Sequence, residues 1–204
     1  MSYSQFTTIR KVKEAFDLNT VEGFHFLSNI SPIHPSQMLV SFLEESLPLA
    51  ACGSDKARSE GIIYPILLEV RRTLKGKISL FSGEDFTVDE SVGLNGVCDF
   101  ILSRSPELLE IEAPAIIIKE AKKADLRTGF GQCIAAMVAA QRFNQQINQP
   151  KNQPISTLYG AVSSGTQWRF LKLEGQTVTI DLVDYPLPPV EQILGFLVWM
   201  IQEG

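Results

Sequence analysis

The chain has 204 residues, 20% of them charged and 45% apolar, a balance typical of one globular domain rather than a disordered protein. Its net charge of −5 gives no global positive field, which counts against a broad nucleic-acid-binding surface, although basic residues can still gather locally. The three cysteines lack Cys-x-x-Cys spacing and indicate neither a disulfide framework nor a cysteine-bound zinc.

Two features of the sequence bear on membranes and location. No apolar run approaches the ~20 residues that a membrane-spanning helix needs. The residues after Met1 do not form a basic and then apolar leader. We therefore expect a cytoplasmic protein that has no membrane partner.

The first quarter of the chain is expected to be helical, with a loop between two helices. Apolar residues at helical spacing predict helices over Ser4–Phe16 and Gln37–Leu49, and the passage Asp17–Pro35 between them is typical of a loop. Basic residues of the first helix are interpreted as a solvated face, and the alternative is an arm that contacts phosphates.

A third helix is predicted from an N-cap at Ser54 to about Leu74. Proline is tolerated in the first turn of a helix but not deep inside one, so Pro65 either kinks this helix or marks its start. A basic cluster follows, which we interpret as a solvated helix end, with phosphate contact as the alternative. Its members are Arg71, Arg72, Lys75 and Lys77. Ile78–Phe81 is expected as the first strand.

Two short apolar strands, Leu94–Leu102 and Ala115–Lys122, organise the middle of the chain. The first carries Asp99, and the second ends in Glu120 and Lys122, which alternation places on one face. Charges held by apolar β structure are costly to desolvate unless they are paired or bind a metal. These three residues therefore indicate a functional site, and the alternative is a structural ion pair at the end of the sheet.

The last third of the chain begins with a helix over Gln132–Gln146, followed by a polar linker to Pro154. Gly129-Phe130-Gly131 before this helix lacks the third glycine and the later acid of a dinucleotide-binding motif. Three further strands are expected over Ile155–Val162, Trp168–Leu173 and Thr177–Val183. The final helix, Val190–Gln202, is apolar nearly all round, so it is buried or lies in an interface, and a homodimer through it is a hypothesis.

Asp99 followed by Glu120-Ala121-Lys122 resembles the signature of the PD-(D/E)XK nuclease superfamily, and the resemblance covers roughly Ser59 to Leu173. It implies an α/β protein with a restriction-endonuclease-like fold, in which a mixed β-sheet core is flanked by α-helices. The whole chain is then a single domain. Its parts are a helical extension (1–53), a core (54–183) and a C-terminal helix (184–204).

The resemblance also assigns roles to site residues. Asp99, Glu120 and the backbone carbonyl of Ala121 are expected to bind Mg²⁺ or Mn²⁺, and Lys122 to orient the attacking water. A helical acid that completes such sites is available as Glu60.

Three further residues are candidates for the same site. Glu69 is the fallback for the helical acid, and Glu112 is a lesser candidate. Gln132 stands where RecB-like members have a catalytic glutamine, whereas Ala136 replaces their tyrosine.

The function expected from this site is a metal-dependent nuclease that hydrolyses phosphodiester bonds of DNA. The alternative is a nuclease-fold module that has lost cleavage and binds nucleic acid or assembles with a partner. A small-molecule enzyme ranks last because the chain has no cofactor motif. Since the domain is small and carries no recognition module, we expect a protein partner or second protomer to contribute specificity.

Overall fold

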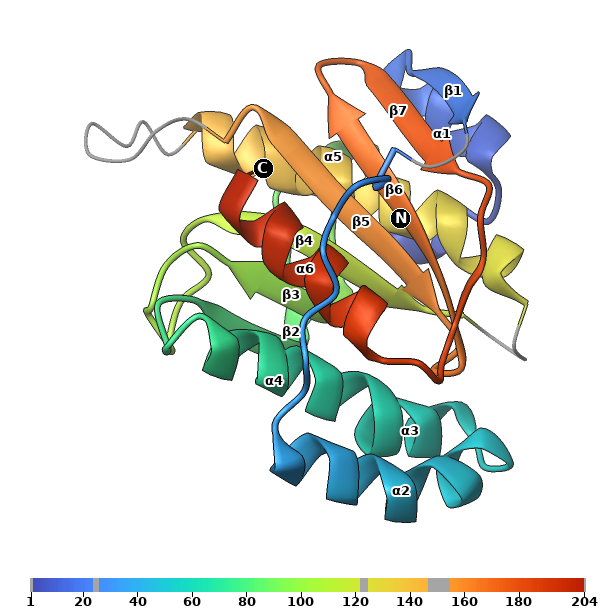
Figure 1. Ribbon diagram of the computed structural model, residues 1–204. Coiled ribbons are helices and arrows are strands. Elements are labelled where there is room, and N and C mark those ends of the chain that lie inside the picture. The colour runs from blue at the N-terminus through green and yellow to red at the C-terminus, as the bar shows by residue number, and fades with distance from the viewer. Residues whose placement is uncertain (1, 24–25, 122–124, 147–154, 204) are drawn as a thin grey trace.

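The computed structural model describes residues 2–23, 26–121, 125–146 and 155–203. Figure 1 shows one mixed β-sheet with helices on both faces. The described strands form an eight-stranded sheet in the order β1-β7-β6-β5-β4-β3-β2, with β8 paired to β6. The pairs β1–β7 and β4–β5 are parallel, and the other pairs are antiparallel. The expected class, an α/β protein with a mixed sheet flanked by helices, is therefore confirmed.

The strands follow the apolar runs of the sequence. The central strand β4 has an uninterrupted apolar stretch because both faces of the sheet are covered there. The bounds are β1 (Asn19–Gly23), β2 (Ser79–Asp85), β3 (Val97–Ser103), β4 (Pro114–Glu120), β5 (Thr157–Ser163), β6 (Gln167–Glu174), β7 (Thr177–Asp181) and β8 (Tyr185–Pro186).

Helices α4 and α6 cover one face of the sheet, and α1 and α5 cover the other (Figure 1). The α-helices are α1 (Ile9–Phe16), α2 (Gln37–Ala51), α3 (Asp55–Arg58), α4 (Tyr64–Thr73), α5 (Phe130–Gln146) and α6 (Glu191–Glu203). Short helical turns are η1 (Tyr3–Gln5), η2 (Ser59–Ile63), η3 (Glu90–Val92) and η5 (Leu126–Gly129). Across the described ranges, no helix combines the length and the apolar character that crossing a bilayer requires.

The predicted third helix is divided into α3, η2 and α4. Ser54 caps it as expected, since its Oγ accepts a hydrogen bond from the Ala57 N–H at 3.2 Å. The middle piece, η2, has π-helical geometry, and the Tyr64 N–H donates to the Ser59 carbonyl five residues back. Pro65 follows directly in the first turn of α4, where its missing N–H is tolerated. Pro65 was expected either to kink the helix or to mark its start, and it marks the start of α4.

The passage Asp17–Pro35, expected as a loop, contains the strand β1. This strand is short and polar, and it lies at the edge of the sheet beside β7, with Val21 opposite Thr179. Its sequence has little apolar alternation, because an edge strand is held by backbone pairing rather than by burial. Residues 1–53, predicted as a helical extension, thus also contribute to the sheet.

The C-terminal helix α6 is covered by its own chain. One side packs on the sheet, and the segment between β1 and α2 crosses its other side (Figure 1). A Cβ atom at Gly195 would lie only 2.4 Å from the carbonyl oxygen of Ser31 in that segment. The apolar surface that suggested a dimer through this helix is therefore buried within the chain, and it gives no reason to expect an interface there.

Candidate active site

Asp99 and Glu120 lie side by side on two interior strands of the sheet, near the start of β3 and at the end of β4. Strands β3 and β4 are antiparallel, with Phe100 opposite Ile118, so the start of β3 meets the end of β4. The Glu120 N–H donates to Oδ2 of Asp99 at 2.8 Å. The structure thus places the carboxylate of Asp99 against the backbone of Glu120 on the adjacent strand, and the two carboxylates interact electrostatically.

The cation beside Asp99 is Lys119, which the sequence interpretation did not assign. Its Nζ lies 2.9 Å from Oδ2 of Asp99, and the two side chains are only 20% and 25% exposed. Lys119 belongs to the same short strand as Glu120 and could have been noticed as a charge at the end of an apolar run. Lys122, the expected lysine, lies outside the described residues.

Glu120 sits in an environment that opposes its charge. Burial, together with the negative charges of Asp99 and Asp55, raises the pKa of Glu120 to about 7, while Arg58 and Lys119 act in the opposite direction. Among the described residues, no hydrogen-bond donor reaches its buried Oε1 atom. A partly buried carboxylate that interacts electrostatically with a second acid is more typical of a functional site than of a stabilising ion pair.

Two further charged residues approach Glu120 from α3. The Arg58 side chain is only 10% exposed; it pairs with Asp55 and donates from Nη1 to the Gly53 carbonyl at 2.8 Å. Both residues interact electrostatically with Glu120. The sequence shows them as an Asp and an Arg three apart in a first helical turn, but it does not show which way that turn faces.

Glu60, predicted as the helical acid of the site, points elsewhere. Its side chain is 66% exposed and pairs with Lys56 at 2.7 Å, and no described contact joins it to Asp99 or Glu120. Consecutive helical residues are separated by about 100° around the axis, so a residue two positions after Arg58 faces roughly the opposite side. Since Arg58 faces Glu120, Glu60 faces solvent.

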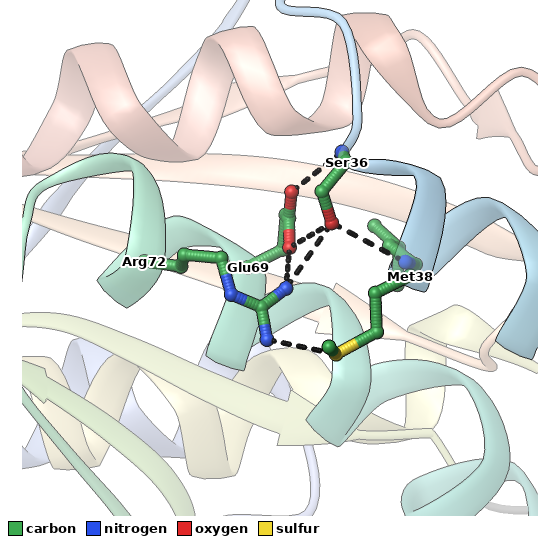
Figure 2. A network of polar contacts seen from close by, with 5 residues as sticks. Ser36, Met38, Glu69 and Arg72 are labelled. Carbon is green, nitrogen blue, oxygen red and sulfur yellow. Dashed lines mark hydrogen bonds and ion pairs between the residues drawn. The ribbon is translucent and has the colours of Figure 1, made fainter.

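The fallback acid, Glu69, belongs to a structural network (Figure 2). Its carboxylate accepts from the backbone N–H of Ser36 at 2.7 Å, from the Ser36 hydroxyl at 3.0 Å and from Arg72 at 2.5 Å. Figure 2 shows these groups converging where α2 begins beside α4. Glu69 therefore joins two helices and makes no described contact with Asp99 or Glu120.

The lesser candidate, Glu112, lies beyond the opposite ends of strands β3 and β4. It accepts a hydrogen bond from the Ser105 hydroxyl at 2.6 Å, in the connection between the end of β3 and the start of β4. Asp99 and Glu120 occupy the opposite ends of these strands, roughly 20 Å away at about 3.3 Å per residue. Glu112 is thus too distant to act with them.

Gln132, in the first turn of α5, is brought to the site. It lines a small cavity together with Asp99 and Lys119, between the sheet and α5. The cavity volume of about 10 Å³ is enough for about one water molecule. Its apolar lining includes Cys98, Cys133 and Ala136. Gln132 therefore lies where a polar side chain can bind a water near Asp99.

The chemistry of the donors suits a hard cation. In the described ranges, no cluster of three or more His, Cys, Asp or Glu side chains is arranged to hold a metal. Mg²⁺, however, is often bound by only one or two carboxylates and retains several waters. Asp99 and Glu120 provide that number, and the described residues give the carboxylate of Glu120 fewer hydrogen-bond donors than its two oxygens can accept. Ala121, the expected carbonyl ligand, is buried next to them, and its N–H donates to the Ser163 carbonyl at 2.7 Å.

No protein-family model matches the sequence, and comparison with curated proteins finds no match.

Proposed function

We propose that this chain is a metal-dependent nuclease with a restriction-endonuclease-like fold, which hydrolyses phosphodiester bonds of DNA. The observation that carries the proposal is the placement of Asp99 and Glu120 side by side on adjacent strands, joined by the 2.8 Å bond from the Glu120 N–H to Asp99. Lys119 beside them and Gln132 on α5 add the polar groups that such chemistry needs. The residues of this site, rather than the overall fold, support the proposal.

Asp99 and Glu120 would hold Mg²⁺ or Mn²⁺, with the carbonyl of Ala121 as a further ligand. When bound, the ion polarises the scissile phosphate and lowers the pKa of a coordinated water. Burial raises the pKa of Glu120, and repulsion from the negative charge of Asp99 raises it further. This repulsion would favour the binding of a divalent cation by the two carboxylates.

The side chains of the site are held in place before substrate arrives. Oδ2 of Asp99 accepts from both the Lys119 ammonium and the Glu120 amide, which fixes the orientation of its carboxylate. Gln132 and Asp99 border a cavity with room for about one water. The positive charges of Lys119 and Lys122 offset negative charge that develops on the phosphate, and Lys122 keeps its expected role in orienting the attacking water.

The test is calorimetric titration of Mg²⁺ and Mn²⁺ into the wild type, Asp99→Ala and Glu120→Ala. Each substitution removes one of the two carboxylates, so each is expected to abolish stoichiometric binding. Glu44→Ala removes the same charge from an exposed position on α2 and is the matched control. The same preparations are incubated with plasmid and single-stranded DNA, with and without metal.

Metal-dependent cleavage that both substitutions abolish supports the nuclease. Metal binding by the wild type without cleavage of either DNA favours the inactive module that binds nucleic acid or a protein partner. A wild type that binds neither ion overturns the proposal and makes the carboxylate pair structural.

A further inference from the structure

Arg58 is a buried cation in α3 that the proposed chemistry has not yet used. Its guanidinium donates to the Gly53 carbonyl from Nη1 and pairs with Asp55 from Nη2. Its third nitrogen, Nε, is buried and has no acceptor among the described residues. A buried donor left unpaired costs free energy comparable to a lost hydrogen bond, so this atom requires an explanation.

Backbone packing places Arg58 beside Glu120. In the sheet, Glu120 pairs with Ser163, the last residue of β5. The turn after Ser163 reaches Gly165, where a Cβ atom would lie 3.3 Å from the Cβ of Arg58 and 3.6 Å from its Cδ. The stem of Arg58 therefore packs on the turn that continues the strand next to Glu120, and the two side chains interact electrostatically.

The unpaired atoms of the two residues are complementary. Arg58 has a buried N–H without an acceptor, and Glu120 has a buried oxygen, Oε1, without a described donor. One bridging water satisfies both atoms at once, and a bound water between buried polar groups is a common arrangement in proteins. Asp99 already has an equivalent partner in Lys119.

We propose that Arg58 is a positioning residue for Glu120: its Nε–H holds Oε1 through one bridging water and leaves Oε2 to bind the metal. Asp55 and the Gly53 carbonyl hold the guanidinium in place for this purpose. The inference rests on the proposed metal site and extends it to α3. Partners that orient a ligand in this way are worth about 10- to 100-fold in metal affinity.

A positioning role of Arg58 and a purely electrostatic role predict opposite changes in Mg²⁺ affinity when Arg58 is replaced. A positive charge near a cation site repels the cation, so removing Arg58 should tighten Mg²⁺ binding if charge alone mattered. If Arg58 orients Glu120, removing it should weaken binding instead. Arg58→Lys separates the two effects, because it keeps the charge but has no nitrogen at the Nε position.

The experiment measures the Mg²⁺ dissociation constant by calorimetry for the wild type, Arg58→Met and Arg58→Lys. We expect both variants to bind about 10- to 100-fold more weakly than the wild type, with the thermal midpoint showing that each is folded. Lys56→Met is the control, since it removes a cation from an exposed pair two residues away. Unchanged or tighter binding by the Arg58 variants overturns the inference.

A second measurement does not depend on the metal. In the metal-free protein, urea midpoints of Arg58→Met, Glu120→Gln and the double variant form a double-mutant cycle. The effects of the two substitutions on the free energy of unfolding are expected to be non-additive. Additive effects overturn the inference, even if Arg58→Met by itself lowers stability. A wild type without Mg²⁺ binding overturns the proposed function, and with it the metal-positioning role. Wild-type binding combined with unaffected Arg58 variants overturns only the role of Arg58.

Discussion

At the scale of single residues, Asp99 and Glu120 differ in what surrounds their carboxylates. Asp99 receives a lysine ammonium and a backbone N–H on the same oxygen, whereas no described donor reaches the buried Oε1 of Glu120. Burial and the neighbouring acids therefore raise the pKa of Glu120 to about 7. This difference predicts how the stability of the metal-free protein depends on pH.

Glu120→Gln is expected to stabilise the metal-free protein at alkaline pH. The folded pKa of Glu120, about 7, exceeds its ordinary value of 4.5, so the folded state favours the protonated carboxyl. The stability from that proton is fully present below pH 4.5 and is lost as the pH rises through 7. Because the carboxyl is only partly buried, we expect a gain of about 1 kcal/mol at pH 8.5, measured by urea denaturation.

The control for this prediction is Glu60→Gln, which removes a charge from an exposed pair with Lys56. Exposed pairs contribute roughly 0–1 kcal/mol, so no comparable gain is expected there. The prediction also requires the advantage of Glu120→Gln to disappear at pH 4. A destabilised Glu120→Gln at pH 8.5 would show that Arg58 and Lys119 stabilise the Glu120 charge more than burial and the neighbouring acids oppose it.

At the scale of elements, hydrogen bonds to the buried carboxylate of Glu69 join α2 to α4 (Figure 2). The Glu69 side chain is only 5% exposed. Ser36, the N-cap of α2, gives this carboxylate both its backbone N–H and its hydroxyl. The same hydroxyl accepts from the Leu39 N–H at 3.3 Å, so one serine caps the helix and joins it to α4.

Glu69→Ala is expected to destabilise the protein by about 2 kcal/mol, because the Ser36 N–H loses its acceptor and Arg72 loses its carboxylate partner. Arg72 is partly exposed, so its charge is recovered by water and the loss stays below that of a fully buried pair. Chemical denaturation measures the effect, with Glu44→Ala on the exposed side of α2 as the control. Equal stabilities of the two variants would contradict a fastening role for Glu69.

At the scale of the whole molecule, the N-terminal segment is packed against the sheet and α5 close to the site. The Tyr3 N–H donates to the Asn95 carbonyl, just before β3, and the Tyr3 side chain lines the cavity shared by Asp99 and Gln132. Gly131 of α5 allows the segment to approach, since a Cβ there would lie 2.2 Å from the carbonyl oxygen of Phe6. The N-terminal segment and α5, which are far apart in the sequence, thus line the same cavity beside Asp99.

Gly131→Ala is expected to displace the segment of residues 2–8. The added Cβ overlaps backbone that cannot move aside cheaply, which we expect to cost about 2 kcal/mol despite the better helix propensity of alanine. Faster cleavage within the segment under limited proteolysis checks the local effect. Gly23→Ala, where no atom lies within 4 Å of the new Cβ, is the control, and equal proteolysis of the two variants would contradict the prediction.

Local sequence determined the strands that carry the two carboxylates. Runs rich in Ile, Val and Phe are too apolar to remain in water, and the predicted strands over 94–102 and 115–122 correspond to β3 and β4. Charges are costly within such apolar runs, and this was enough to predict that Asp99 and Glu120 belong to a functional site. The Ser54 cap and the start of α5 near Gln132 were likewise predicted from local signals.

Only the tertiary structure decided which charges surround the carboxylates. The orientation of α3 about its axis selects Arg58 rather than Glu60, and it is set by the packing of that helix on the β5–β6 turn. The strand β1 and the covering of α6 also depend on partners distant in the chain. Periodicity specifies which residues of an element are apolar, but the contacts between elements determine which face meets the site, because those contacts join segments with no local relationship.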